Sequence, residues 1–200
     1  MKLNVQLFER IIEPDAPRFK EKVSKFTASM VEQIDTLANI ANTFSNFARM
    51  PSSKKMKLNL SETVENTLFL YQSVNIKLFQ AKEPLFINGD NEQIISVLNN
   101  ILKNAIEASK ENSIAEIVVR LEQSNDQALL EIKDSGTGMS EEVQKKVFEP
   151  NFTTKNSGMG LGLAMVKQII NDLNGSIKFI SEENVGTTFY LSVPLMKQKN

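Results

Sequence analysis

The stretch NNILKNAIEA, residues 99–108, places two asparagines four residues apart within an apolar pattern of helical period. In an α-helix, side chains at positions i and i+4 project from the same face, so we expect the amides of Asn100 and Asn104 to lie side by side. The helix itself is predicted from about Asp90, a suitable N-cap residue, to Ser109. An isolated polar pair at this spacing usually belongs to a solvated helix face. The pair therefore becomes informative only together with two glycine-rich segments that follow it.

The first of these segments is DSGTG, residues 134–138, which directly follows a predicted strand. A carboxylate at the end of a strand can accept a hydrogen bond from the amine of a nucleobase, and glycines let the backbone approach the base closely. Asp134, Gly136 and Gly138 are therefore candidate base-binding residues. Taken alone, the segment is equally consistent with an ordinary turn.

The second segment is SGMGLGL, residues 157–163, which opens a predicted helix. Glycines at this position free backbone amides to hold a phosphate at the positive end of the helix dipole. No strand immediately precedes the segment, which disfavours a Rossmann site, and the Gly-Lys-Ser/Thr of a P-loop is missing. A single G-x-G-x-G is a weak indicator, and the order of all three segments is what strengthens the prediction of a nucleotide site.

The rest of the C-terminal region predicts a mixture of helices and strands. Helices are predicted near 61–72, 90–109 and 161–173, and strands or short apolar runs at 76–79, 85–87, 114–122, 128–133, 176–181 and 187–193. A hairpin turn is expected within 124–127, and Asn174-Gly175 is a helix stop signal. This order predicts an α+β fold, a two-layer sandwich of a mixed sheet with helices on one face.

The N-terminal region predicts a long amphipathic helix. From Phe19 to Ala48 apolar residues recur at near-heptad spacing, and neither proline nor glycine occurs between Pro17 and Pro51. About 30 residues at 1.5 Å each give a helix of about 45 Å, which favours a helical bundle over a small globular core. A shorter helix predicted before Pro14 could cover less than half of this apolar stripe. Another subunit, residues upstream of the chain, or both would have to cover the remainder.

Composition excludes several classes of function. The 200 residues are 41% hydrophobic and 24% charged, which suffices for one core and a smaller helical unit. Lys+Arg 23 against Asp+Glu 24 gives a net charge of -1, which disfavours binding to nucleic acid. The absence of cysteine excludes disulfides and thiolate chemistry and favours a reducing compartment. No apolar run approaches the length of a membrane span, so we expect the chain as given to be soluble.

Together, the three segments resemble the Bergerat-type ATP-binding fold shared by sensor histidine kinases, gyrase-type ATPases and heat-shock chaperones. VFEPNFTTK, residues 147–155, resembles the phenylalanine box and lid of the kinases, and GTTF, residues 186–189, resembles their last glycine box. The resemblance implies an ATP-binding catalytic domain over 57–196. It also implies that residues 1–51 are a partial dimerisation hairpin.

The same resemblance implies a role for each matching position. Asn104 would be the Mg²⁺ ligand, Asn100 and Lys103 the catalytic pair near the phosphates, and Asp134 the acceptor of the adenine amine. ATP and Mg²⁺ are the implied cofactors. The other nucleotide-binding residues implied are Ala105, Ala108, Gly136, Gly138, Phe148, Phe152, Thr154, Lys155, Gly158, Gly160, Leu161, Gly162 and Thr187.

Asn100 separates two activities within this superfamily. In the gyrase-like hydrolases, the corresponding helix position is a glutamate that activates water. An amide has no basic atom for that task, so the resemblance implies transfer of the γ-phosphoryl group rather than rapid hydrolysis. The expected activity of the parent protein is that of a protein histidine kinase, although this chain alone is not expected to autophosphorylate.

The chain contains no histidine. In the family, the helical hairpin dimerises into a four-helix bundle that carries the phosphoaccepting histidine. Residues 34–51 resemble the second hairpin helix of nitrogen-regulation-like sensor kinases, and residues 1–7 resemble the part of the first helix just after the histidine. The resulting hypothesis is that Met1 lies a few residues downstream of that histidine.

Two other classes of function remain open. One is a histidine-free ATP-binding regulator, and the other is a serine kinase or ATPase of the same superfamily. The resemblance further implies a homodimer formed through the hairpin, a response regulator receiver domain as partner, and no nucleic acid. It places the chain in the cytoplasmic portion of a sensor whose membrane segments would lie outside this sequence.

Overall fold

The protein is represented by a computed structural model that describes residues 19–48, 54–109, 116–155 and 159–197. The chain divides into two compact units, Met1–Arg49 and Met50–Asn200. Within the described ranges, no helix combines the length and the apolar character that crossing a bilayer requires.

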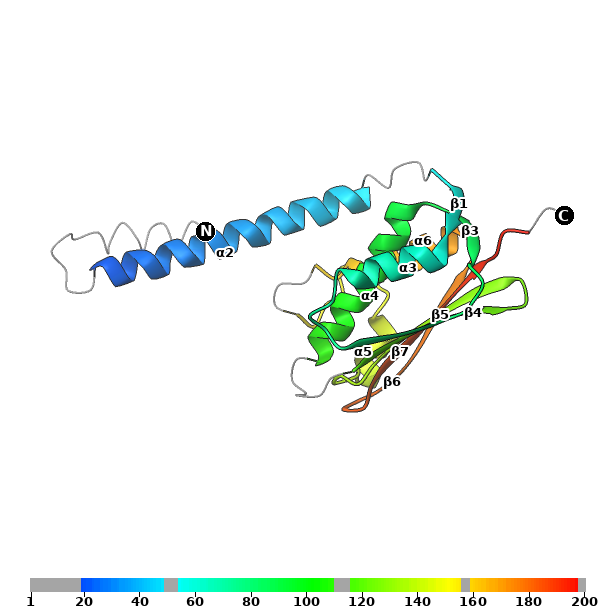
Figure 1. Cartoon of the computed structure of the whole chain (residues 1–200). Helices are drawn as coiled ribbons and strands as arrows, with labels where there is room; N and C mark the ends of the chain where they lie inside the picture. Colours follow the sequence, from blue (N-terminus) through cyan, green and yellow to red (C-terminus); the bar gives the residue numbers. More distant parts are fainter. Residues whose placement is uncertain (1–18, 49–53, 110–115, 156–158, 198–200) are drawn as a thin grey trace. The chain divides into compact units, whose positions relative to one another are not determined.

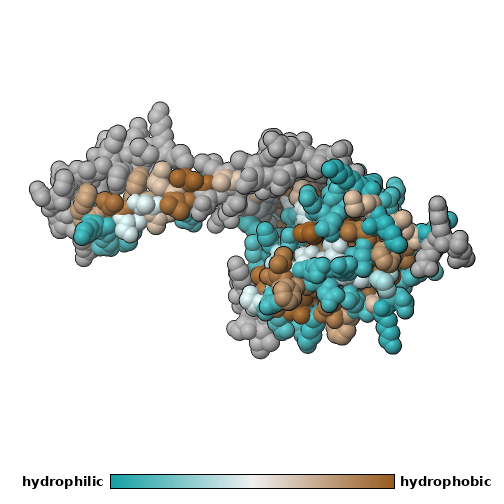
Figure 2. Space-filling model, turned by 45° about the horizontal axis from the view of Figure 1, so that its top comes forward, coloured by the Kyte–Doolittle hydropathy of each residue, from teal (hydrophilic) through white to brown (hydrophobic). Residues whose placement is uncertain are grey.

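The first unit contains α2 (Phe19–Ala48), a helix of 30 residues that confirms the predicted long helix. An ion pair between Lys25 and Glu21, one turn apart, spans 3.0 Å on its surface. Val31 and Ile34 are 52% and 54% exposed, and Figure 2 shows apolar residues along the described part of this helix. The shorter helix predicted before Pro14 lies outside the described residues, as do most side chains of α2 beyond Ile34.

The second unit is built on a five-stranded sheet with the strand order β2-β4-β5-β7-β6. The pair β2–β4 is parallel and the other three pairs are antiparallel, so the predicted mixed sheet is confirmed. A second, two-stranded antiparallel sheet pairs β1 with β3. The strands are β1 (Met56–Asn59), β2 (Ile76–Gln80), β3 (Phe86–Gly89), β4 (Ile117–Ser124), β5 (Gln127–Asp134), β6 (Ser176–Glu182) and β7 (Gly186–Pro194).

Three helices cover one face of the large sheet, as predicted: α3 (Leu60–Phe69), α4 (Asn91–Ser109) and α6 (Gly162–Asp172) (Figure 1). Burial along β5 alternates residue by residue, because successive side chains of a strand point to opposite faces. The inward-facing residues pack against apolar residues of the helices in one continuous core. This core fixes the positions of the strand and helix ends that carry the glycine-rich segments.

Helix ends follow the signals in the sequence. The Asp90 carboxylate accepts hydrogen bonds from the backbone amides of Glu92 and Gln93 at the start of α4, at 3.0 and 3.4 Å, as expected of an N-cap. After α6, Asn174 adopts a left-handed conformation with φ of 57°. The Gly175 amide then donates to the Ile170 carbonyl at 2.9 Å, which closes the helix.

Two elements were not predicted. The strand β1 is only four residues long, which is too short for an alternating pattern to stand out. The helix α5 (Glu141–Lys146) lies within the polar, glycine-rich region and buries none of its six residues, so it has no apolar stripe. Both elements depend on neighbours that are distant in sequence, namely β3 and the end of β6.

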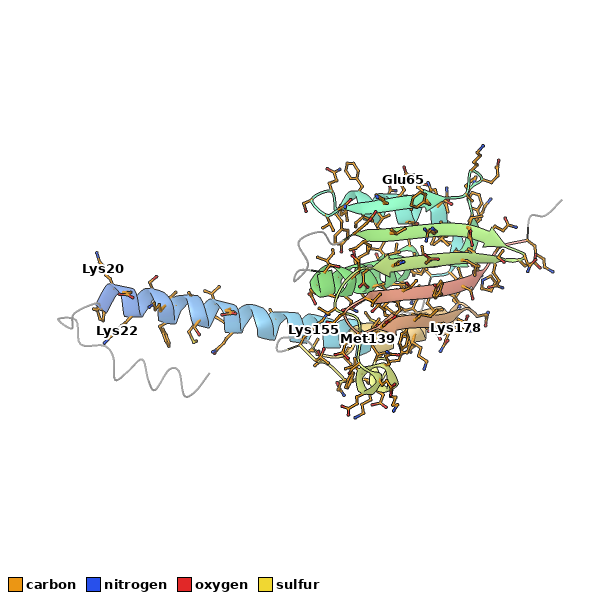
Figure 3. All side chains as sticks on the ribbon, turned by 90° about the horizontal axis from the view of Figure 1, so that it is seen from below. Lys20, Lys22, Glu65, Met139, Lys155 and Lys178 are labelled. Atoms are coloured by element: carbon orange, nitrogen blue, oxygen red, sulfur yellow. The ribbon has the colours of Figure 1, made fainter. Side chains whose placement is uncertain are left out.

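The other face of the large sheet carries mainly polar side chains, and Figure 3 looks onto it. Arg120 on β4 pairs with Glu131 on β5 at 2.5 Å and lies over the ring of Phe79 on β2 at 5.5 Å. Lys178 on β6 is exposed on the same face. The polar character of this face contrasts with the helix-covered face, at whose end the candidate site lies.

Candidate functional site

The two asparagines of α4 are half-buried on one face of the helix, as the spacing predicts. The Asn100 Nδ2 donates to the Ser96 carbonyl at 2.8 Å. Its Oδ1 points at the start of α6, where a Cβ on Gly162 would lie only 2.6 Å away. Asn100 therefore lies directly against the glycine-rich helix start, and a larger residue at Gly162 would have to displace the Asn100 amide.

Asp134 closes β5 and is 4% exposed. Its Oδ1 accepts hydrogen bonds from the backbone amides of Gly136 at 2.9 Å and Thr187 at 3.2 Å. Burial raises the pKa of Asp134 above its usual value, because desolvation disfavours the charged form, while the two amide hydrogen bonds partly oppose the shift. The structure thus brings together three predicted site residues from two neighbouring strands and the loop between β5 and α5.

The loop after Asp134 is held from two sides. On one side, the Thr137 amide donates to the Ala108 carbonyl at 3.1 Å, and a Cβ on Gly136 would lie 2.7 Å from the Ala108 backbone. On the other side, the Asn184 amide donates to the Thr137 carbonyl at 2.7 Å. Gly138 has φ of +64°, and a Cβ there would lie 2.0 Å from the Glu182 carbonyl oxygen. The loop is therefore clamped between the end of α4 and the turn that joins β6 to β7.

The predicted lid region begins from an aromatic contact. The Phe148 ring meets Phe179 of β6 edge-on, with centroids 5.7 Å apart, and the Lys167 ammonium lies 5.4 Å from the Phe148 centroid. At the far end, Gly160 has φ of +66°, and a Cβ there would lie 2.3 Å from the Phe152 carbonyl oxygen. The two ends of the segment 152–160 therefore touch each other. The predicted phosphate-binding residue Gly158 lies outside the described residues.

Lys155 connects this segment to α4. Its Nζ donates to the Asn104 Oδ1 at 2.7 Å and forms an ion pair with the Glu107 carboxylate. Its backbone amide donates to the Thr153 Oγ1 at 3.0 Å. Figure 3 labels Lys155 and Met139 at the end of the sheet where β5 ends. A cation thus already lies on the oxygen that the family resemblance assigns to a metal.

The side-chain atoms near Asn104 determine whether this arrangement could hold a metal ion. In the described ranges, no group of three or more acidic, histidine or cysteine side chains could hold a metal. The Asn104 oxygen is half-buried and accepts a hydrogen bond from an ammonium, so it can face a cation. Mg²⁺ prefers oxygen ligands and commonly takes most of them from phosphates and water. The site fits Mg²⁺ that arrives together with a nucleotide.

The remaining predicted residues are distributed around this centre. Ala105 and Leu161 are buried, Ala108 and Phe152 are half-buried, and Lys103 and Thr154 are exposed. Leu161 is the N-cap residue of α6, so the helix starts at the last glycine of the segment, as expected.

Two functional candidates were missed by reasoning from the sequence. Glu107 sits one turn after Asn104 and reads as an ordinary solvated residue until Lys155 is seen beside it. Gln144 of α5 donates through Nε2 to the carbonyls of Met139 at 2.8 Å and Ser181 at 3.1 Å, joining α5 to the loop after Asp134 and to β6. The contacts of Glu107 with Lys155 and of Gln144 with Ser181 have no local signal, because in each case the partner comes from a segment distant in the chain.

Residues 89–197 match the family model described as histidine kinase-, DNA gyrase B-, and HSP90-like ATPase. The signal transduction histidine-protein kinase AtoS of Escherichia coli is 34% identical over 88% of this chain and 30% of its own length. A putative sensor histidine kinase NtrY-like of Rickettsia felis is 29% identical over 94% of this chain and 33% of its own length. The chain thus spans about a third of the length of these relatives.

The structure is similar to that of the catalytic domain of histidine kinase ThkA, with a TM-score of 0.63 and 31% identity over 70% of this chain and 95% of that domain. A crystal structure of ThkA in complex with the response regulator protein TrrA superposes with a TM-score of 0.70 and 24% identity. That match covers 97% of this chain and 57% of ThkA, and it supports the fold.

Proposed function

The chain belongs to the family of histidine kinase-, DNA gyrase B-, and HSP90-like ATPases and carries the ATP-binding catalytic domain of a sensor histidine kinase, and we propose from this premise that it transfers the γ-phosphoryl group of Mg-ATP to a histidine outside its own sequence. Buried Asp134 is the observation that carries the proposal. Two backbone amides occupy its Oδ1, which leaves Oδ2 to accept a hydrogen bond from the adenine amine.

The phosphate side of the proposed site is formed by α4 and the start of α6. Backbone amides near Gly160 and Gly162 are placed at the positive end of the α6 dipole, which favours a bound anion. Asn104 would offer its oxygen to Mg²⁺, and Lys155 would offer its ammonium to the phosphates. Bound Mg²⁺ supplies charge neutralisation for the transferring phosphoryl group.

The orientation of Asn100 supports transfer over hydrolysis. Its amide nitrogen is engaged with the Ser96 carbonyl and its oxygen faces Gly162. Neither atom can remove a proton from water, so the described residues of α4 offer no general base at this position. ATP held without such a base would persist until an acceptor nucleophile arrives, which suits a kinase of the class EC 2.7.13.3.

The acceptor and the onward partner belong to the same proposal. Because the sequence has no histidine, the acceptor would lie elsewhere in the parent protein, on a bundle to which α2 contributes. We infer a homodimer through the N-terminal unit and onward transfer to a response regulator receiver domain. The chain would form part of the cytoplasmic portion of a membrane-bound sensor.

Labelling with γ-³²P-ATP tests the proposal. The chain as given should take up no label, whereas a version extended upstream should gain a label that is lost in acid, as expected of phosphohistidine. Acid-stable label would instead favour a serine kinase on the same fold. No label on either version, with ATP still bound, would favour a histidine-free regulator and would contradict the proposed transfer.

A further inference from the structure

Lys155 bridges two side chains that α4 presents on the same face. Asn104 and Glu107 are three residues apart, so their side chains are neighbours on the helix surface. The Lys155 ammonium donates to the Asn104 Oδ1 at 2.7 Å and pairs with the Glu107 carboxylate. The oxygen assigned to the metal is therefore engaged by a cation of the protein itself.

We propose that Lys155 is a stand-in for the metal: in the nucleotide-free protein its ammonium occupies the Asn104 oxygen, Glu107 holds it there, and Mg-nucleotide binds by displacing it. This inference rests on the proposed function and adds a role for Glu107. Glu107 is a positioning residue that acts through Lys155 and weakens the binding of Mg-nucleotide.

The Lys155 ammonium and Mg²⁺ would compete because both require the same Asn104 oxygen. An ammonium at hydrogen-bonding distance and a magnesium ion, which binds oxygen at about 2.0–2.1 Å, cannot share one face of a single amide oxygen. Two cations at that separation also repel each other. Displacement is feasible because the phosphates of the nucleotide offer the ammonium a new anionic partner.

The exposure of the Lys155 and Glu107 side chains sets the expected size of the effect on nucleotide affinity. The side chains of Lys155 and Glu107 are 43% and 46% exposed, so water and salt screen their attraction. An ion pair of this kind changes an equilibrium constant by about two- to fivefold. The contact is therefore strong enough to tune nucleotide affinity and weak enough to be broken at each round of binding.

A double-mutant cycle on nucleotide affinity tests the proposal. Dissociation constants for Mg²⁺ with a non-hydrolysable ATP analogue are measured for the wild type, Lys155→Met, Glu107→Gln and the double variant. Because the pair would exist only in the free protein, the wild type should bind about two- to fivefold more weakly than the other three values predict by additivity. This comparison is independent of any contact that Lys155 makes with the phosphates. A coupling factor of one, or a coupling that strengthens binding, overturns the proposal.

Two controls isolate the metal-binding oxygen. Lys77 on β2 and Glu116 just before β4 form a comparable exposed pair, and the cycle of Lys77→Met and Glu116→Gln should give a factor of one. Adenosine lacks phosphates and requires no metal, so its binding should also show no coupling between Lys155 and Glu107. Equal coupling for adenosine would mean a general effect on the fold and would overturn the proposal.

The same measurements separate this inference from the proposed function. If the wild type binds neither adenosine nor Mg-nucleotide, both are wrong. If it binds both ligands but the coupling factor is one, only the displacement of Lys155 is wrong. Binding with the expected coupling for Mg-nucleotide alone supports the inference.

Discussion

At the scale of single residues, the geometry of Asp134 determines what an asparagine in its place would present. The two backbone amides at Oδ1 would retain the amide oxygen of the variant, so its NH₂ group would face the adenine amine as donor against donor. We therefore expect Asp134→Asn to weaken ATP binding by about tenfold or more, since an unmatched buried donor costs about 1–3 kcal/mol. Isothermal titration calorimetry measures this change.

Inosine triphosphate provides the matched control for this variant. Its 6-oxo group is an acceptor, so the NH₂ of Asp134→Asn should favour it, and the preference of wild type for ATP over inosine triphosphate should shrink or reverse. The fold should persist, because the oxygen on the two amides is kept. If the variant binds ATP like the wild type, adenine does not occupy this position.

If Asp134 binds the adenine amine as proposed, its raised pKa should make nucleotide binding sensitive to acid. Protonation would place a hydrogen on Oδ2, the oxygen left to accept from the adenine amine, so ATP affinity should fall as the pH drops through the raised pKa of Asp134. The loss should begin at a higher pH than an exposed aspartate would give. Affinity measured from neutral to mildly acidic pH checks this; an unchanged affinity down to the usual titration range of aspartate would contradict it.

The same pKa shift has the opposite effect on folding stability. As the pH falls, ATP affinity should decrease, but the contribution of Asp134 to stability should increase. The folded protein binds the proton of Asp134 more readily than the unfolded chain does, so ionisation costs stability. This cost is fully present above the folded pKa and disappears as the pH falls towards the unfolded pKa. The contribution should be missing in Asp134→Asn, which serves as the control when thermal midpoints are compared across the same pH range.

At the scale of elements, we expect Gln144 to give the short helix α5 a role in shaping the proposed nucleotide site. Replacing it with alanine removes two hydrogen bonds, to the Met139 and Ser181 carbonyls. We expect a loss of about 1–3 kcal/mol in the free energy of unfolding, at roughly 0.5–1.5 kcal/mol for each of the two bonds. ATP affinity should fall several-fold as well, because Met139 ends the loop that carries Gly136 and Gly138. Urea denaturation and calorimetry measure the two effects.

Gln123→Ala is the matched control. Gln123 also donates through Nε2 to one backbone carbonyl, that of Asn125, but it does so in the β4–β5 hairpin at the other end of the sheet. Its replacement should leave ATP affinity unchanged. If Gln144→Ala lowers stability and keeps full affinity, α5 supports the fold without shaping the site.

The sequence predicted those elements whose pattern is carried by their own residues. The helix α4 shows the helical period and a capping aspartate, β5 alternates buried and outward residues, and α6 ends at the Asn174-Gly175 stop signal. The glycine-box segments that carry Asp134 and Thr187 were recognised in the sequence, but the pairing of these two residues is found only in the structure. The mixed sheet with helices on one face follows from the order of these elements.

Contacts between distant segments could not be predicted in this way. The helix α5 has no buried face and is fixed by Gln144 to the end of β6. The pair of Lys155 with Glu107 forms because the segment after Phe152 returns to α4, which no local pattern indicates. The roles of Asn104 and Lys155 toward metal and phosphate stay predictions, as does that of Gly158, which lies outside the described residues.

At the scale of the whole molecule, the two units separate proposed tasks. Every predicted nucleotide-binding residue lies within Met50–Asn200, which has its own hydrophobic core. The unit Met1–Arg49 contributes α2, and the apolar residues Val31 and Ile34 of this helix are more than half exposed. This division supports a model in which the second unit holds ATP and the first assembles subunits.

Removing residues 1–49 tests that division. Residues 50–200 should keep the thermal midpoint of the nucleotide unit and bind Mg-ATP within about twofold of the intact chain, because the core and the site residues all remain. The intact chain should sediment as a dimer and the shortened chain as a monomer, since a helix of about 45 Å offers a long apolar stripe to a second copy.

Val31→Glu together with Ile34→Glu in the intact chain is the control that leaves the length unchanged. In a bundle these apolar positions would be buried, and the introduced carboxylates would have no oppositely charged partners there. Dimerisation should therefore weaken, while Mg-ATP affinity stays the same. Loss of nucleotide binding on removal of residues 1–49 would mean that α2 contributes to the site. A monomeric intact chain, or a dimer indifferent to both glutamates, would mean that this part of α2 is not the surface through which subunits assemble.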